Sequence, residues 1–494
     1  MKHLAYCAPI LLAACGVSSA PDSAIAESAV ANLALPLNHA GRWITDAQGR
    51  VVILHGMNMV YKKPPYAPDA VGFDDDDAAF MAGEGYNTVR LGVLHEAVEP
   101  KPGMYDDAYL ERIAGTVDTL GAHGIVSLLD FHQDLFNEKF GGEGLASWAV
   151  EDDGLPAQPQ LNFTLDYFLE PGLNAAFDNF WHDQAAVDGA GLQEHYDAAW
   201  AHVARRFKDD PNVLGYDLFN EPWPGTQAAT CLQPLGCPLF DSLLTSFSRK
   251  AIAAIRQADP RTLVWYEPNV IFNNGANTNL GPMNDAHVGF SFHDYCLQES
   301  FTNSNLGCDV FDNLVFAEAV QHVQSTGDAI LMTEFGASND AGNLEAMVDR
   351  ADGNMVGWQE WAYCDCQDPT TTGPGVEAIV NDPAKPPVGS NLNIPKLQIL
   401  SRGYPQAIAG TPTSYGFDAA SKVLSLDYLT SRADGGGVFP AGTETDIGLP
   451  ARQYPNGYSV VVSGATVLSA ANATVLRIAS LAGATEIRVT VNPR

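Results

Sequence analysis

The sequence predicts an α/β protein in which a (β/α)8 TIM barrel is followed by a C-terminal antiparallel β-sandwich-like domain. Eight short apolar runs alternate with longer helix-like segments from residue 50 to about 400. This pattern is typical of parallel strands that are buried on both faces and joined by helices. Nearly every run ends in a polar or aromatic residue. After residue 417 the pattern changes to short alternating segments with Gly and Pro turns, which indicates antiparallel strands.

The eight predicted strands end in side chains that are suited to chemistry. The strands lie at 51–58, 87–93, 125–132, 213–221, 262–268, 287–295, 329–335 and 355–363, and helical patterns such as 106–122, 194–208, 240–257 and 312–326 separate them. The residues at or near their ends are Asn58, Arg90, His132, Glu221, Glu267, His293 with Tyr295, Glu334 and Trp361. Because the carboxyl ends of the strands form the active face of a TIM barrel, these side chains are predicted to surround one cleft.

The same patterns predict the domain boundaries. The barrel is expected over 38–405 and the small β domain over 411–494. Long inserts after the third and fourth strands, at 133–190 and 222–239, are expected to form the walls of the cleft.

The first twenty residues have the features of a secretory signal peptide, with Lys2, a short apolar core and then small residues. The motif "LAAC" at 12–15 resembles a bacterial lipobox, in which Cys15 becomes the lipidated first residue; the alternative is ordinary cleavage after Ala20. Residues 21–37 are then a linker. The sequence therefore predicts a secreted or cell-surface-anchored bacterial lipoprotein.

Composition narrows the choice of partners. The chain has 494 residues, 46% of them hydrophobic, so it can bury a large core. Its formal net charge of −33 argues against nucleic acid and anionic membrane surfaces as partners. An extracellular protein with an uncharged or weakly charged substrate fits this balance better.

The cysteines favour disulfides over a metal site. Apart from Cys7 and Cys15 there are six, in three close pairs: Cys231 with Cys237, Cys296 with Cys308, and Cys364 with Cys366. In an exported protein such pairs indicate disulfides. We expect the first two pairs to be bonded, whereas a 364–366 bridge would close a very tight ring and is not favoured. Zinc is the alternative, but no histidine recurs at the spacing of a zinc finger.

Two strand-end acids suggest a reaction. Glu221 and Glu334 end the fourth and seventh strands, and across a barrel mouth they could take the spacing of about 5–5.5 Å that a retaining glycosidase needs. One acid would give its proton to the leaving oxygen and the other would attack the anomeric carbon. Asn220 is placed to bind the sugar 2-hydroxyl. The alternative for Glu221 is a helix N-cap or a turn acid.

Several motifs resemble a known family. "FNEPW", "TEFG" and Arg90 resemble the retaining glycosidases of clan A, glycoside hydrolase family 5. "GMNMVYKKPPYAP", "DFHQD", "LFNEPWPG" and "WQEWAY" resemble the endoglycoceramidases more narrowly, endogalactosylceramidase-type members included. The resemblance covers about residues 38–490. It implies a retaining endo-β-glycosidase that hydrolyses the linkage between oligosaccharide and ceramide in glycosphingolipids.

The resemblance also implies roles for individual residues. Glu221 would be the acid/base and Glu334 the nucleophile, oriented by Tyr295. Sugar contacts are implied for His132 and Asp134 with Asp130 nearby, for Lys62 rather than Lys63, for Trp361 by stacking, and for His293 and Glu360 as further candidates. Arg90 would hold Glu334 or Asn220 in place rather than touch substrate, and Glu267 is either a supporting acid or a loop residue.

A lipid substrate also needs an apolar slot. Candidates to line it are Met57, Met59, Val60, Tyr61, Trp223 and Pro224, although each could serve ordinary loop packing. The stretch 363–371 is where residues that distinguish reducing-end glucose from galactose are expected.

Two other functions compete with this interpretation. One is a family 5 β-glucanase or cellulase-like hydrolase of soluble glycans, and the other is a non-catalytic glycolipid-binding lipoprotein. The leading interpretation requires neither a metal nor an organic cofactor. Its expected partners are a glycosphingolipid and the membrane or micelle surface that presents it, without nucleic acid, and the expected form is a monomer.

Overall fold

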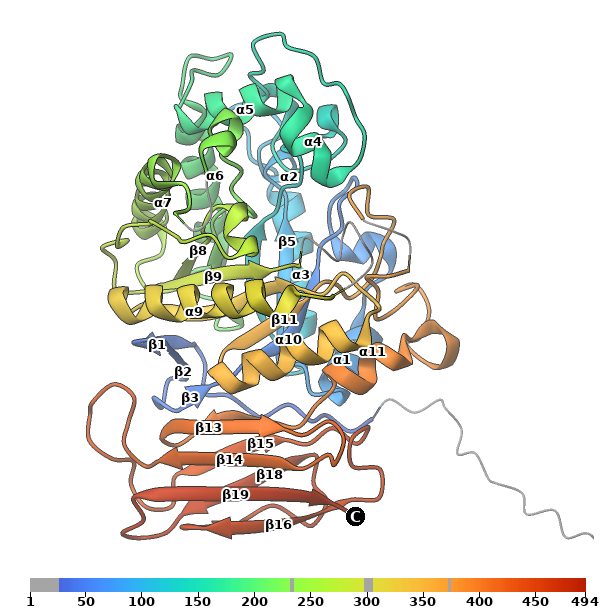
Figure 1. The fold of residues 1–494 in the computed structure, drawn as a ribbon, viewed down its shortest axis with the longest axis vertical. Helices are drawn as coiled ribbons and strands as arrows, with labels where there is room; N and C mark the ends of the chain where they lie inside the picture. Colours follow the sequence, from blue (N-terminus) through green and yellow to red (C-terminus); the bar gives the residue numbers. More distant parts are fainter. Residues whose placement is uncertain (1–25, 232–234, 297–304, 372–374) are drawn as a thin grey trace, which may run out of the picture.

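The computed structural model describes residues 26–231, 235–296, 305–371 and 375–494 (Figure 1). The predicted signal peptide, the lipobox and the first part of the linker lie outside these residues. Among the described residues, no helix combines the length and the apolar character needed to cross a membrane.

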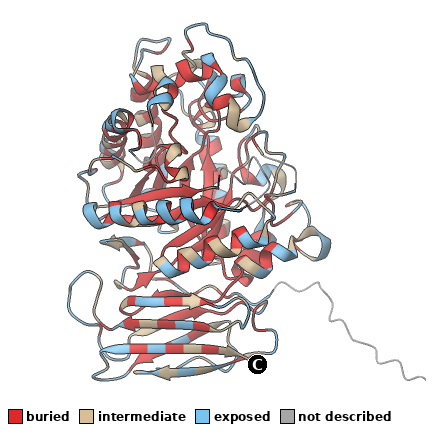
Figure 2. Cartoon of the chain, viewed as in Figure 1, coloured by how far each residue is buried: buried red, intermediate tan, exposed pale blue. Residues whose placement is uncertain are grey.

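Eight parallel strands close into a barrel, which confirms the predicted fold class. In barrel order they are β4 (His55–Met59), β5 (Thr88–Val93), β6 (Val126–Phe131), β7 (Val213–Asp217), β8 (Leu263–Tyr266), β9 (Val288–Asp294), β10 (Ala329–Phe335) and β11 (Gly357–Glu360), and β11 pairs with β4. Seven of them fall within the predicted apolar runs, whereas β4 overlaps the run 51–58 and ends one residue beyond it. All their residues are buried, because one face packs inside the barrel and the other packs against helices (Figure 2).

Helices connect most of the strands. The longer helices that follow the barrel strands outside the two inserts are α1 (Asp75–Gly83), α3 (Asp107–Ala122), α6 (Leu192–Phe207), α7 (Pro238–Ala258), α9 (Cys308–Thr326), α10 (Ala341–Asn354) and α11 (Ile394–Leu400). Asp74 and Asp106 begin α1 and α3 by accepting backbone N–H groups, as N-cap residues do. The crossover from β8 to β9 is described throughout and contains only the short 3-10 helix η5 (Val270–Asn274).

The two predicted inserts carry short helices beside the barrel mouth. The first contains α4 (Phe163–Leu169) and α5 (Pro171–Trp181), with η2 (Glu138–Phe140) and η3 (Ser147–Ala149), and the second contains η4 (Gly225–Thr230). The other short elements are η1 (Pro68–Val71), α2 (His95–Val98) and η6 (Gly389–Asn391). Since α5 packs against η4, the two inserts support each other.

Two antiparallel sheets form the second domain, shown beneath the barrel in Figure 1. One has the order β1-β2-β3-β12-β15-β18-β17 and the other β13-β14-β19-β16. Their strands are β1 (Asn38–Ala40), β2 (Trp43–Thr45), β3 (Val51–Val52), β12 (Tyr404–Ile408), β13 (Thr411–Phe417), β14 (Leu424–Leu429), β15 (Glu444–Gly448), β16 (Tyr458–Ser463), β17 (Ala465–Val467), β18 (Val475–Ser480) and β19 (Glu486–Pro493). Apolar residues between the sheets, such as Tyr428 and Ile478, form their own core.

The N-terminal segment differs from the expectation. Residues 38–52, assigned above to the barrel, supply β1–β3 to the larger sheet, because β3 pairs with β12 and Val51 is buried in the β-domain core. Residues 26–37, expected to be a linker, bury Ala31, Leu33 and Leu37 against barrel residues such as Trp265. This segment joins the barrel to the β domain.

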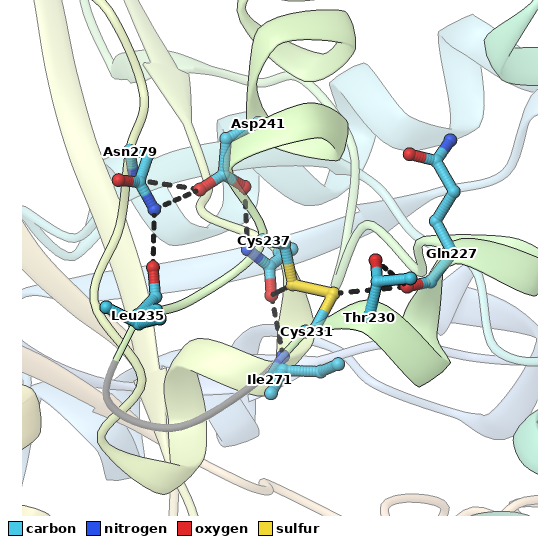
Figure 3. The surroundings of a disulfide bond; sticks show 9 residues. Gln227, Thr230, Cys231, Leu235, Cys237, Asp241, Ile271 and Asn279 are labelled. Atoms are coloured by element: carbon cyan, nitrogen blue, oxygen red, sulfur yellow. Dashed lines mark hydrogen bonds between the residues drawn. A yellow bond between two sulfur atoms is a disulfide. The ribbon is translucent and has the colours of Figure 1, made fainter.

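The described residues contain three disulfides. Cys231–Cys237 and Cys296–Cys308 confirm the predicted pairs. Cys364–Cys366 is bonded as well, so the expectation that this ring is too tight was wrong. The Cys231–Cys237 bond joins the end of η4 to the start of α7, close to Asp241 (Figure 3).

Candidate active site

Glu221 and Glu334 meet at the carboxyl ends of their strands. Glu334 lies within β10, and Glu221 lies just beyond the end of β7. One oxygen from each carboxylate and one nitrogen of His293 lie within 4.8 Å of one another. This proximity fits the shorter of the two glycosidase spacings, about 5–5.5 Å between carboxyl groups, which is the retaining one.

Arg90 connects the groups around these carboxylates. Its fully buried guanidinium donates from Nη1 to Oε1 of Glu334 at 2.5 Å and from Nη2 to Oδ1 of Asn220 at 3.0 Å. Its other partners are Asn58, Asp130, Asp217 and Glu267. The sequence left open whether Arg90 holds Glu334 or Asn220, and Arg90 contacts both.

Two residues that were predicted to bind substrate do not line the cleft. Asp130 is fully buried, where its Oδ2 lies 2.7 Å from Nδ1 of His132 and its Oδ1 contacts Arg90. The imidazole of His293 lies 2.9 Å from Oε1 of Glu221 through Nδ1 and 3.3 Å from Glu267 through Nε2. The polar atoms of both residues face protein groups of the site.

Burial and charge shift the titration of these groups. Burial opposes protonation of His293, but Glu267 and Glu334 outweigh it and raise the pKa of His293 well above its usual value. Burial raises the pKa of Glu334, and His293 and Arg90 oppose this rise. Tyr295 donates to Oε2 of Glu334 at 2.9 Å, and burial raises its pKa so strongly that it remains a donor. The nucleophile candidate therefore has donors on both oxygens.

Lys62 lies in a second polar cluster, next to the ring of Trp361. Its Nζ is 2.5 Å from Oδ2 of Asp134, 2.8 Å from Oδ2 of Asp368 and 2.7 Å from Oγ1 of Thr370. It also lies 4.5 Å from the centre of the Trp361 ring. Since an ammonium group has three N–H donors, each donor of Lys62 has a protein acceptor.

His132 belongs to the same cluster. Its ring stacks on Trp361 with centroids 5.2 Å apart. Burial lowers the affinity of the ring for a proton, but Asp130 and Asp134 outweigh burial and raise the pKa of His132 to about 10. Both residues of this stacked pair line the cleft.

A cleft of about 560 Å³ contains most of the predicted residues. Those that line it are Lys62, His132, Asp134, Asn220, Glu221, Tyr295, Glu334 and Trp361. A second group of lining residues is apolar and comes from α4, the loop after β7 and η5: Phe163, Tyr167, Phe168, Trp223, Val270 and Ile271. The cleft therefore combines a polar region with an apolar wall, as a substrate with a sugar part and a lipid part requires.

The apolar wall is not where the sequence placed it. Met57, Met59 and Val60 are buried in the barrel core, and of the six residues expected to line the slot only Trp223 does so. Trp223 packs edge-to-face on Phe168, with centroids 4.8 Å apart. Glu360 is also outside the cleft, because its buried carboxylate pairs with Lys396 at 2.7 Å.

Within the described part of the chain, two groups of side chains have the spacing of metal ligands. They are His132 with Asp134 and Glu143, and Glu221 with His293 and Glu334. In the first, the ammonium of Lys62 already lies 2.5 Å from Asp134 and 3.8 Å from Glu143. In the second, nitrogen and hydroxyl donors already bind the carboxylates. In both groups, protein cations or hydrogen-bond donors already contact carboxylates that a metal would need.

Besides the apolar wall, sequence reasoning missed three polar residues of the cleft that bind Glu221 or Lys62. Asn273 donates from Nδ2 to Oε1 of Glu221 at 2.8 Å, and Asp368 and Thr370 bind Lys62. Asp368 and Thr370 lie in the stretch 363–371, where the sequence leads us to expect residues that distinguish sugars, so this expectation could have found them. Asn273 lies in a loop without a recognisable motif.

Comparison with known proteins agrees with this geometry. Residues 45–367 match the family model described as Cellulase (glycosyl hydrolase family 5), and residues 402–491 match the glycoside hydrolase family 5 C-terminal domain. Endoglycoceramidase I of Rhodococcus hoagii is 34% identical over 452 residues, which cover 89% of this chain and 84% of that protein.

Solved structures agree as well. Endo-glycoceramidase II from Rhodococcus sp. superposes with a TM-score of 0.75 at 30% identity, covering 92% of this chain and 99% of that one. That protein has also been solved as a lactosyl-enzyme intermediate, which superposes with a TM-score of 0.75 at 29% identity. A third structure, its complex with ganglioside GM3, superposes with a TM-score of 0.74 at 28% identity. Both cover 92% of this chain and 99% of that one. With most of its length matched in sequence and in fold, the chain belongs to glycoside hydrolase family 5 and, within it, to the endoglycoceramidase family.

Proposed function

We propose that this glycoside hydrolase cleaves the bond between the oligosaccharide and the ceramide of glycosphingolipids with retention of anomeric configuration. The observation that carries the proposal is one cleft in which Glu221 and Glu334 lie together beside an apolar wall. The lactosyl-enzyme and GM3 structures of the Rhodococcus relative support the same chemistry and substrate class.

In the first step, Glu334 attacks the anomeric carbon and Glu221 gives its proton to the glycosidic oxygen. The bond from the anomeric carbon to that oxygen breaks, and ceramide leaves with a hydroxyl group. Arg90 and Tyr295 hold the two oxygens of Glu334. In the second step, Glu221 takes a proton from water, which attacks the anomeric carbon and releases the oligosaccharide and Glu334.

We infer further that the substrate is presented by a membrane or micelle. Four apolar side chains around α4 are exposed although this helix forms part of the cleft wall: Leu155, Leu161, Phe168 and Leu169, at 43–58%. Exposed apolar groups beside a cleft favour contact with lipid. We also propose that the protein is secreted or anchored at the cell surface as a lipoprotein, which its three disulfides support. We propose further that the enzyme is a monomer, since one chain supplies every site residue named above.

The test compares wild type, Glu221→Gln and Glu334→Gln on a ganglioside and on a 6-linked galacto-series glycolipid, with products resolved by mass spectrometry. We expect intact oligosaccharide and free ceramide from wild type alone, and the better substrate identifies the preferred headgroup. The competing function is hydrolysis of soluble β-glucans. Cleavage of cellooligosaccharides without cleavage of either lipid would favour it and overturn the proposal.

A further inference from the structure

The segment that follows β8 contacts Glu221 at two points. The side chain of Asn273 donates from Nδ2 to Oε1 of Glu221 at 2.8 Å. The carboxylate of Glu267 accepts the backbone N–H of Glu221 at 2.9 Å. Since this crossover has η5 in place of an α-helix, it can pass close to the barrel mouth and reach a residue at the end of the neighbouring strand.

We propose that Asn273 is a positioning residue for the general acid, because it fixes which oxygen of Glu221 carries the transferable proton. This inference rests on the proposed function only in taking Glu221 as the proton donor. It requires a glycosidase reaction of some kind and does not depend on a lipid substrate.

The contacts distinguish the two oxygens of Glu221. Asn273 Nδ2 and His293 Nδ1 approach the same oxygen, Oε1, at 2.8 and 2.9 Å. An amide N–H is a donor only, so the oxygen that faces it is an acceptor. In the protonated acid, Oε1 is then the carbonyl oxygen and Oε2 carries the proton. Without Asn273, one of the two contacts that impose this choice is lost, and the carboxyl group can rotate.

The backbone of Glu221 makes its orientation sensitive to such contacts. Its φ of 45° is in the left-handed region, which costs a residue with a side chain about 1–2 kcal/mol. The bond to Glu267 holds this conformation, and Glu267 is itself held by Arg90 at 2.9 Å. The general acid is therefore supported through its backbone by Glu267 and through its side chain by Asn273.

Asn273 is held firmly enough for this role. Asn269 begins η5 by accepting the N–H of Ile271 at 3.1 Å and donates to Oδ1 of Asp241 at 2.7 Å. Asp241 lies in the first turn of α7, next to the Cys231–Cys237 disulfide (Figure 3). The N–H of Val270 also binds the carbonyl of Pro222 at 3.1 Å. Thus η5 is bonded both to α7 and to the residue that follows Glu221.

The test uses Asn273→Ala and a series of aryl β-lactosides whose leaving groups range from dinitrophenol to unsubstituted phenol. A dinitrophenolate leaves without a proton, whereas phenol and ceramide need one. We expect kcat/KM to fall by less than about 3-fold for the dinitrophenyl lactoside and by about 10–100-fold for the phenyl lactoside, the range of a general acid contribution. The change should lie in kcat and not in KM.

Asn381→Ala, in an exposed loop outside the cleft, is the control and should leave the whole series unchanged. Equal losses for all leaving groups would overturn the proposal, because they would indicate a fault in folding or in the nucleophile, and thermal unfolding separates these two. No loss for any lactoside would also overturn it. If wild type cleaves the lactosides but not a glycolipid, the proposed lipid substrate fails while the inference on Asn273 is still tested.

Discussion

The guanidinium of Arg90 lies 2.5 Å from Oε1 of Glu334, although the two residues are 244 positions apart in the chain. The same guanidinium lies 3.0 Å from Oδ1 of Asn220. One side chain in β5 therefore aligns the nucleophile candidate with the residue beside the acid/base candidate. An arginine suits this position because its donors point in fixed, planar directions.

Replacing Arg90 with lysine should lower kcat by about 10²–10³-fold, as does removing one donor from an active-site anion. The ammonium group keeps the charge but cannot bind Glu334, Asn220 and the buried acids at once. Steady-state kinetics on an aryl β-lactoside measure the effect, with thermal unfolding to check the fold. Arg112→Lys is a matched control, since Arg112 pairs with Asp69 at the surface. A loss of less than 3-fold in Arg90→Lys would contradict the role given to Arg90.

Lys62 and Lys63 are adjacent but should respond differently to replacement by methionine. Lys62 is 5% exposed and each of its donors binds an acceptor, so Lys62→Met removes the ammonium group that Asp134 and Asp368 share and leaves His132, 3.6 Å from Asp134, as the cation beside that carboxylate. We expect a loss of about 3–5 kcal/mol in the free energy of unfolding, together with a higher KM. Lys63 is partly exposed, and Lys63→Met should change stability by less than about 0.5 kcal/mol. Urea unfolding compares the two, and equal losses would contradict the structure of the cluster.

Asp197 in α6 predicts a pH-dependent stability. Burial raises the pKa of Asp197 to about 8 from an ordinary value of 3.8, and Lys250 only partly opposes the rise. Between these values the folded state keeps a proton that the unfolded state releases. Its contribution to stability is therefore greatest below pH 4 and is lost as the pH rises to 8.

Asp197→Asn cannot titrate, so it should become more stable than wild type as the pH rises. We expect little difference in Tm at pH 4 and an advantage of at least about 2 °C for the variant at pH 8. Thermal unfolding at both values measures this. Asp209→Asn, at an exposed position just after the same helix, is the control and should show no such trend. An advantage that shrinks as the pH rises would reverse the assigned sign.

The barrel and the meeting of Glu221 with Glu334 at its mouth could be predicted because their signals are local. Each strand is a short apolar run, and the barrel itself brings strand ends such as Glu221 and Glu334 together. The same argument failed for Asp130, because it precedes His132 by two residues on the same face of the strand, where its carboxylate contacts Arg90 and His132 and does not line the cleft. A position at the end of a barrel strand predicts that a residue lies near the active site, but it does not predict whether its side chain lines the cleft.

The remaining features depend on loops and on distant pairing. The apolar wall comes from α4 in a long insert, whose position relative to the barrel has no local signal. Asn273 reaches Glu221 only because η5 replaces a helix. The pairing of β3 with β12 joins residues far apart in the chain, so the sequence offered no reason to move residues 38–52 out of the barrel.

The exposed apolar side chains at α4 lead to a prediction on substrate presentation. Leu161 and Leu169 lie at the two ends of this helix and are 58% and 46% exposed, whereas Phe163 and Tyr167 between them line the cleft. If α4 contacts lipid, Leu161→Ser with Leu169→Ser should slow cleavage of a glycolipid in phosphatidylcholine vesicles by about 10-fold, since each half-exposed leucine loses about half of the roughly 1.5 kcal/mol of transfer free energy that a fully buried side chain gives. The rate on a soluble aryl β-lactoside should not change, because neither side chain lines the cleft. Val461→Ser, equally exposed on β16 of the β domain, is the control and should affect neither rate. Unchanged vesicle rates would mean that α4 does not meet the lipid surface, and equal losses on both substrates would mean that the double variant disturbs the cleft wall itself.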